Sequence, residues 1–252
     1  MRDALIVLAT FVTLAFSSQA QTAEELVNKN IQAKGGMEKI KAIKSVRIKG
    51  KLIGGGGFTA ATLQENERPN KVRETFSLQG MTAVTAYDSA TGWQIQPFGG
   101  HKDPELMGED DLRDLLLDAD FDGPLVDYKE KGNTVEFMGH DEVDGDDALR
   151  LKVTLKDGDI IYYFLDPDTF LEIRKEVQEF IRGSIRETVV DLGSYKPVAG
   201  VMYPFSISQG SKANPGAQTT TVEKIEVNVQ IPDTDFAVPA SLRGAKADAD
   251  KK

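Results

Sequence analysis

Two histidines, His101 and His140, are the first candidates for metal binding or proton transfer, because imidazole titrates near neutral pH and readily ligates metals. They lie far apart in the sequence and form neither a metal-binding spacing nor an evident catalytic dyad. We therefore interpret both as surface or half-buried structural residues. The sequence predicts no bound metal and no cofactor.

The run from Asp118 to Gly123, DADFDG, matches the opening of a calcium-binding loop. The match then fails, because the twelfth position is Lys129 where a bidentate glutamate is needed. Pro124 also takes the position of the carbonyl ligand, and no second helix follows. A solvated acidic end of a helix is the favoured interpretation, and calcium binding stays open as the alternative.

Nucleophilic and hydrolytic groups give no clearer signal. Cysteine is absent, which excludes a cysteine nucleophile, a thiolate metal site and a lipid anchor on cysteine. None of the serines lies in the glycine-flanked turn that exposes an attacking hydroxyl. With 40 acidic residues any sheet brings some carboxylates together, so their pairing indicates no reaction. A hydrolase of unknown substrate remains an alternative, although no residues of the sequence are identified as its catalytic site.

Four consecutive glycines, residues 54–57, could in principle cradle a phosphate. A phosphate loop needs a helix after the glycines and a lysine placed to reach the phosphate. Here the glycines separate one strand-like segment from another. We therefore interpret them as the tip of a hairpin.

The N-terminus has the pattern of a secretory signal peptide. Arg2 precedes an apolar run over residues 4–16, and Ser18 and Ala20 occupy the positions that a signal peptidase reads. We expect residues 1–20 to be removed, so that the mature protein is soluble in the periplasm. The run is too short to favour the alternative of a membrane anchor. The net charge of -10 makes nucleic acid a poor partner.

Alternating strands dominate the mature chain. Leu149, Leu151 and Val153 alternate with polar residues, which is the period of a strand with one buried face. Residues 160–165 are apolar on both faces and lie between two acidic turns. Similar runs on either side predict an antiparallel meander in a single domain over residues 21–240. Residues 241–252 are expected to form a disordered tail.

Two helices are expected before the first strand. Thr22 and Glu25 fit a capping box at the start of the first, and residues 37–42 form the second. At the other end, residues 211–217 are polar and are expected to form a loop. A last strand is predicted to extend to Ile231, because apolar and polar residues alternate up to that point.

A further amphipathic helix, with Glu109 at its acidic N-terminus, is inserted among the strands. Its apolar residues have the spacing i, i+3, i+4 and i+7, namely Leu112, Leu115, Leu116 and Ala119. Two interpretations stay open. The helix either caps one end of a barrel or forms a lid over an apolar interior.

The chain resembles exported proteins of the outer-membrane lipoprotein-sorting superfamily, a group related to the carrier LolA and its acceptor LolB. The resemblance rests on four segments that follow one another, GMEKIKAIKSVRIKGKL, DFDGPLVDYKEKG, YYFLDPDTFLEIRKE and YKPVAGVMYPFSI. It covers residues 21 to about 239. It implies a mainly β fold, in which one curved antiparallel sheet forms an unclosed, half-open β-barrel around an apolar cavity, with an N-terminal helix and an inserted lid helix.

The resemblance also implies a function without catalysis. The protein would bind or carry acyl chains of lipoproteins or other lipids in the cavity, each buried CH₂ contributing about 0.8 kcal/mol. An alternative is a periplasmic sensor or interaction module that regulates a membrane protein of the envelope. Seven residues are the candidates for cavity wall and lid: Phe76, Trp93, Leu112, Leu115, Leu116, Phe137 and Tyr163.

Overall fold

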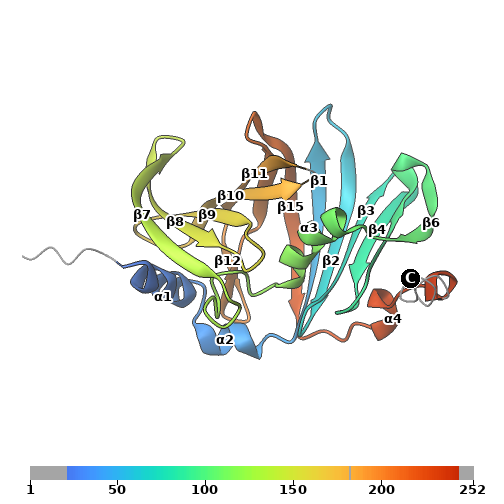
Figure 1. Cartoon of the computed structure of the whole chain (residues 1–252), viewed down its shortest axis with the longest axis horizontal. Helices are drawn as coiled ribbons and strands as arrows, with labels where there is room; N and C mark the ends of the chain where they lie inside the picture. Colours follow the sequence, from blue (N-terminus) through green and yellow to red (C-terminus); the bar gives the residue numbers. More distant parts are fainter. Residues whose placement is uncertain (1–21, 182, 244–252) are drawn as a thin grey trace, which may run out of the picture.

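The computed structural model describes residues 22–181 and 183–243 (Figure 1). Within them the chain is mainly β, with few helices and one large antiparallel sheet of thirteen strands that does not close into a barrel. The predicted fold class is confirmed. The predicted signal peptide, residues 1–20, lies outside the described residues, and so does most of the predicted tail.

The strands of the large sheet are β1 (Ser45–Gly54), β2 (Thr59–Glu67), β3 (Lys71–Leu78), β4 (Met81–Tyr87), β5 (Gly92–Gln96), β6 (His101–Leu106), β7 (Thr134–Val143), β8 (Asp146–Thr154), β9 (Ile160–Leu165), β10 (Glu172–Ile181), β11 (Ser184–Gly193), β14 (Ser206–Ser211) and β15 (Asn214–Val227). A small separate sheet contains β12 (Lys196–Val198) and β13 (Val201–Tyr203). The helices are α1 (Ala23–Ala33), α2 (Met37–Ala42), α3 (Glu109–Ala119) and α4 (Asp233–Phe236), with short 3₁₀ turns at Pro97–Gly99 and Ala240–Leu242.

The order of the strands explains the shape of the sheet. β1 pairs with β15 at its centre, β2 to β6 extend outward from β1, and β14, β11, β10, β9, β8 and β7 extend outward from β15. The chain thus runs from the centre to the β6 edge, crosses to the β7 edge and returns through hairpins. We call β1 to β6 the first wing, and β7 to β11 with β14 and β15 the second wing. Figure 1 shows the wings as the two sides of a half-barrel, with α3 between them.

The N-terminal helices form as their sequence predicts. The Glu25 backbone N–H donates to Thr22 Oγ1 at 3.2 Å, and the Thr22 N–H donates to Glu25 Oε2 at 2.9 Å, which completes the capping box. Gly35 then turns the chain toward α2 with a φ of +123°. A Cβ at this position would lie 2.2 Å from the carbonyl oxygen of Gly200, so the turn requires glycine.

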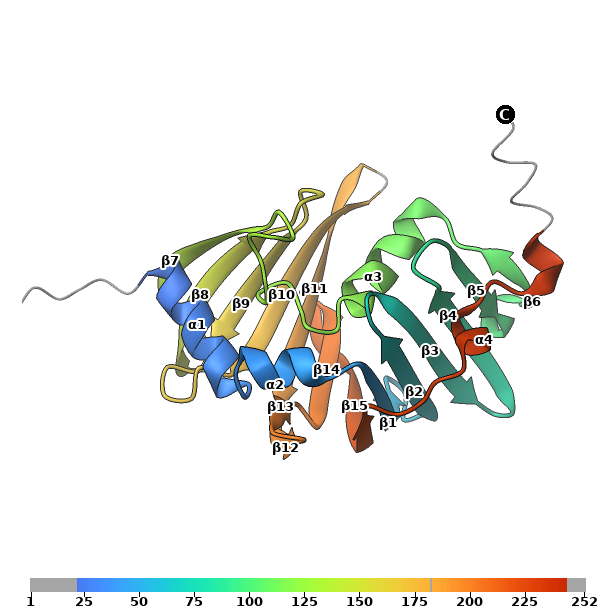
Figure 2. The same cartoon turned by 90° about the horizontal axis from the view of Figure 1, so that it is seen from below.

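The larger hydrophobic core lies in the second wing. Leu26 and Ile31 of α1 pack with Leu149 and Leu151 of β8 and with Ile161 of β9. Figure 2 shows α1 and α2 lying along this wing. The helices cover the strands near the β7 edge. The strands nearer the centre of the sheet, β10, β11 and β14, are not covered by them and face the first wing.

The crossover between the wings, residues 107–133, contains α3. This helix packs on the first wing, where Leu115 and Ala119 contact the fully buried Val72 of β3. After the helix, Asp122 accepts hydrogen bonds from Arg68 at 2.6 and 2.7 Å and from Lys41 of α2 at 3.1 Å. Both the helix and the turn that follows it are therefore anchored to other elements.

The C-terminal segment covers the opposite face of the first wing. Ala86 packs with Trp93 and Val238, whereas the next residue, Tyr87, packs with the α3 side. Since successive strand residues point to opposite faces, Trp93 lies on the outer face. Its indole N–H donates to the carbonyl oxygen of Phe236 at 2.9 Å.

Two sequence predictions about the chain end are wrong. Residues 211–217 do not form a loop, because β14 ends at Ser211 and β15 already begins at Asn214. The last strand ends at Val227 instead of Ile231, since Asn228 adopts a φ of +56° and its Oδ1 accepts from the Lys44 N–H at 2.7 Å. This bond turns the chain out of the sheet.

No helix in the described part of the chain is long and apolar enough to cross a membrane.

Candidate ligand-binding cavity

A cavity of about 890 Å³ lies between the two wings beneath α3. Side chains from β1, β2, β3 and β4 line it on one side, and side chains from β9, β10, β11, β14 and β15 line it on the other. Its volume falls within the range of small-molecule sites, about 300 to 1,000 Å³. The topology explains the cavity, because the crossover holds the wings apart while β1 and β15 join them at the base.

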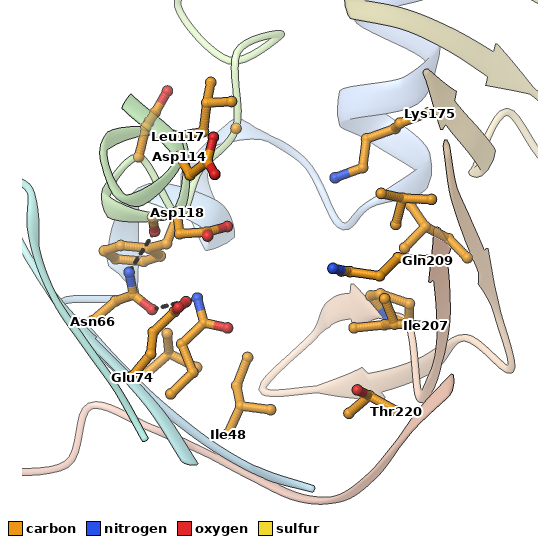
Figure 3. A pocket seen from close by; sticks show the side chains of 18 of the residues that line it. Ile48, Asn66, Glu74, Asp114, Leu117, Asp118, Lys175, Ile207, Gln209 and Thr220 are labelled. Carbon is orange, nitrogen blue, oxygen red and sulfur yellow. Dashed lines mark hydrogen bonds between the residues drawn. The ribbon is translucent and has the colours of Figure 1, made fainter. Parts of the chain in front are cut away.

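One end of the cavity is mainly apolar, with Thr220 as a polar side chain on its wall. Figure 3 shows Ile48 of β1 and Ile207 of β14 on its lower side. Leu117 of α3 faces the cavity from above. Val177, Leu192 and Val222 add further apolar lining. A hydrocarbon chain placed among these residues would be removed from water.

The other part of the cavity is charged, which corrects the expectation of a wholly apolar interior. Glu74 of β3 and Asp118 of α3 project from the first wing side, and Lys175 of β10 projects toward them from the second wing (Figure 3). Gln209 of β14 lies near Lys175. The alternation in β10 explains the difference, because Lys175, Val177 and Glu179 point inward together while their neighbours point outward.

The two carboxyl groups hold their protons more tightly than usual. Burial raises the pKa of Glu74 to about 8, and the charges of Asp118 and Asp114 add to this shift. Burial also raises the pKa of Asp118 to about 6, against the lowering effect of Lys175. By accessible area Glu74 is half-buried and Asp118 is exposed, because the cavity itself admits water. Protein surrounds them on the other sides.

A second charged group ties α3 to the second wing. Arg186 of β11 donates to Glu179 Oε2 at 2.6 Å and also pairs with Asp114 of α3. Burial and the neighbouring Asp114 raise the pKa of Glu179 to about 7, and Arg186 opposes the shift. The group is therefore a contact between the helix and the wall beneath it.

The backbone of α3 is also fixed to the first wing from inside the cavity. The Asn66 side-chain amide of β2 donates to the Asp118 carbonyl oxygen at 2.6 Å. Asn66 is fully buried. Gln64 donates in turn to Asn66 Oδ1 at 3.1 Å, so a short polar chain leads from the cavity wall to the end of the helix.

The structure divides the seven predicted cavity residues. Phe76 and Tyr163 lie in the cavity lining. Phe76 packs edge-to-face with Phe98, their ring centroids 5.5 Å apart. Tyr163 is buried in the larger core and reaches the lining from β9.

The other five predicted residues lie outside the lining. Trp93 is on the outer face, Phe137 packs in the core beneath α1, and Leu112 and Leu115 pack on Val72. Leu116 is 40% exposed to solvent. The side of α3 that faces the cavity therefore carries Leu117 with Asp114 and Asp118, residues that the i, i+3, i+4 pattern did not select.

The acids of the calcium-like run do not converge on one point. Asp118 faces the cavity, Asp120 pairs with Lys131 at 2.6 Å, and Asp122 pairs with Arg68. Within residues 22–181 and 183–243, no group of three or more histidines and acids is placed to hold a metal ion.

Comparison with known proteins identifies the fold of this chain but no relative by sequence. No family model and no curated protein matches the sequence. Solved structures share the fold, and among them are these three. A DUF1329 family protein from Desulfovibrio piger has 13% identity and a TM-score of 0.57, over 85% of this chain and 97% of that one. A LolA superfamily protein from Nitrosomonas europaea has 12% identity and a TM-score of 0.56, over 87% and 99%.

The third structure is a putative outer membrane lipoprotein-sorting protein domain from Vibrio parahaemolyticus. It has 12% identity and a TM-score of 0.53, over 83% of this chain and 97% of that one. At such identities the likeness concerns the fold. The chain therefore has the fold of the LolA superfamily, which confirms the structural part of the resemblance found in its sequence.

Proposed function

We propose that this chain is a non-catalytic binding or carrier protein of the periplasm, and that its ligand is an amphiphile with an acyl chain. The observation that carries the proposal is the cavity of about 890 Å³ between the wings, with an apolar end around Ile48 and Ile207. A chain buried there gains about 0.8 kcal/mol for each CH₂ removed from water. The lipoprotein-sorting description of one structural neighbour supports the same ligand class.

The proposal is tested by purification of the protein with its own N-terminus from periplasm without detergent. Native mass spectra are recorded before and after organic extraction. We expect an extractable mass in the acyl-lipid range, and a protein mass that corresponds to cleavage after Ala20. A protein that takes up neither endogenous lipid nor an added fluorescent fatty acid would contradict the proposal.

Two neighbouring leucines of α3 provide a matched pair of variants. Leu117 faces the cavity and Leu116 faces solvent, being 40% exposed. Leu117→Asp is expected to weaken binding of the fluorescent fatty acid at least tenfold, because it adds a negative charge beside Asp114 and Asp118 that repels the carboxylate of the fatty acid. Leu116→Asp should bind as the unaltered protein does. Circular dichroism of both variants shows whether the fold is retained.

A second candidate function, docking on an envelope membrane protein, is favoured by one surface feature. Phe180 and Ile185 are 63% and 67% exposed and pair with each other near the end of the β10–β11 hairpin. Large apolar side chains exposed together often mark a contact surface. Replacing both by serine should abolish copurification of a membrane partner and leave lipid binding unchanged. If the double variant still copurifies with the membrane partner, the hairpin is excluded as the docking element.

A further inference from the structure

Three ionisable side chains of the cavity lining have no partner within residues 22–181 and 183–243. Glu74, the Asp118 carboxylate and the Lys175 ammonium form no hydrogen bond and no ion pair with any described residue. Other charged residues of the lining are paired. Lys34 pairs with Glu172 at 3.3 Å, and Arg186 pairs with Glu179 at 2.6 Å. The unpaired groups are thus a distinct set.

The unpaired charges face one another across open space. Figure 3 shows Asp118 and Lys175 pointing toward each other from α3 and β10, with Glu74 on the same side as Asp118. Burying charges without partners costs free energy, and a direct ion pair would recover part of that cost. The wings instead hold the opposite charges apart, which leaves room for a third group between them.

The position of these charges relative to the apolar lining is also informative. Asp118 and Lys175 lie toward α3, and Ile48 and Ile207 lie on the lower side of the cavity in Figure 3. The cavity is therefore divided into a charged part and an apolar part. A ligand that satisfies both must be amphiphilic.

We propose that the cavity takes an amphiphile with a zwitterionic head group, whose primary ammonium binds between Glu74 and Asp118 and whose anionic group, such as a phosphodiester, binds Lys175. The acyl chain then extends toward Ile48 and Ile207. This inference rests on the proposed function and specifies its ligand class, which is that of phosphoethanolamine lipids.

The charges balance in such a complex. At neutral pH Glu74 keeps its proton, since its pKa is about 8, and Asp118 is largely ionised, since its pKa is about 6. One carboxylate and one lysine then face one ligand cation and one ligand anion. A primary ammonium has three N–H donors and can bond both side chains, whereas a quaternary ammonium has none.

The test compares two lysophospholipids with the same acyl chain by isothermal titration calorimetry below their critical micelle concentrations. Lysophosphatidylethanolamine carries the ammonium, and lysophosphatidylglycerol carries the phosphodiester alone. The unaltered protein is expected to bind the first at least tenfold more tightly. Equal affinities would overturn the head-group proposal and leave lipid binding intact. Binding of neither lipid would instead overturn the proposed function as well.

Variants assign the preference to its residues. Glu74→Gln combined with Asp118→Asn should abolish the preference and retain binding of lysophosphatidylglycerol. Lys175→Gln should weaken both lipids by a similar factor. Glu176→Gln, the neighbour that lies outside the cavity lining, is the matched control and should change neither affinity. A preference that survives the double substitution would contradict the assignment.

A last comparison separates a lipid from a free head group. Glycerophosphoethanolamine has the same charges without the acyl chain. It is expected to bind at least a hundredfold more weakly than lysophosphatidylethanolamine, because it leaves the apolar part empty. Equal affinity would show that the acyl chain contributes nothing to binding, and would overturn the proposal that the ligand is an amphiphile.

Discussion

Arg113 of α3 forms an ion pair with Asp159, in the turn before β9, with its Nη1 3.2 Å from Asp159 Oδ1. The helix packs on the first wing, whereas Asp159 belongs to the second. Asp159 Oδ1 also accepts from the Phe180 N–H at 3.3 Å, which connects the pair to the end of β10. This ion pair therefore connects α3 to the second wing.

Breaking this contact should loosen α3. Arg113→Ala leaves the buried Asp159 carboxylate without its cation, at a cost of about 1 kcal/mol given that the arginine is partly exposed. We expect faster amide hydrogen exchange in residues 109–119 and faster ligand release. Lys152→Ala, which removes an ion pair with Glu136 inside one wing, is the control and should leave exchange in α3 unchanged. Equal exchange in the unaltered protein and in both variants would show that the ion pair between Arg113 and Asp159 does not hold α3 in place.

The cavity acids predict an unusual pH dependence of stability. Between about pH 5 and pH 8 the folded protein binds more protons than the unfolded chain, because the folded pKa values of Asp118 and Glu74 are raised to about 6 and about 8. The free energy of unfolding should therefore fall as pH rises through this window. The charged groups that face them are Asp114 on α3 and Lys175 on β10.

Urea denaturation at pH 5, 6, 7 and 8 checks this dependence. Glu74→Gln with Asp118→Asn should flatten the curve, while Glu179, whose pKa is about 7, leaves a residual slope. The acids with lowered pKa values, such as Asp122, titrate below this window and act in the opposite direction. A free energy that rises between pH 5 and pH 8 would contradict the prediction.

The anchor after α3 should contribute strongly to stability. Burial alone would raise the pKa of Asp122, but its bonds to Arg68 and Lys41 outweigh burial and lower it. Asp122→Asn removes the charge opposite a partly buried arginine, and we expect a loss of about 3 kcal/mol in the free energy of unfolding. Asp127→Asn removes a more exposed partner of Lys41 and should cost under about 1 kcal/mol. Similar losses in both variants would contradict the prediction.

The turn between α1 and α2 should not tolerate a side chain. Gly35→Ala combines a φ of +123° with a Cβ that would lie 2.2 Å from a carbonyl oxygen, so we expect a loss of at least about 3 kcal/mol. Gly56→Ala also has positive φ but meets nothing within 4 Å, and should cost only about 1 kcal/mol. Thermal denaturation of both variants measures the difference. Equal losses would show that close approach is unimportant.

Local signals predicted much of the fold correctly. The capping box of Thr22 and Glu25 and the start of α3 at Glu109 depend on neighbouring residues alone, and the structure places both as expected. The β14–β15 hairpin was missed because its strands are rich in serine, threonine and glutamine, which also suit a loop. The end of β15 depends on the bond between Asn228 and Lys44, and no local pattern shows a contact between residues so far apart.

The charged part of the cavity could not be predicted from the sequence. α3 has two faces in use, one with Leu115 against the first wing and one with Leu117 toward the cavity, and the periodicity identified the first. Lys175 lies in a run of charged residues that reads as a solvated strand. Only the curvature of the whole sheet brings it opposite Glu74 and Asp118.

The pairing of β1 with β15 has a consequence for the order of folding. Within each wing most pairs are hairpins between neighbouring strands, whereas Val46 and Val227 at the central seam are roughly 180 residues apart. Pairing strands so far apart in the chain loses loop entropy before stabilising contacts form. We therefore expect β1 and β15 to pair last. The wings then form as two hairpin arrays, and the binding site exists only once the final long strand is in place. A chain that stops before β15 would have most of the strands of this protein and none of its cavity.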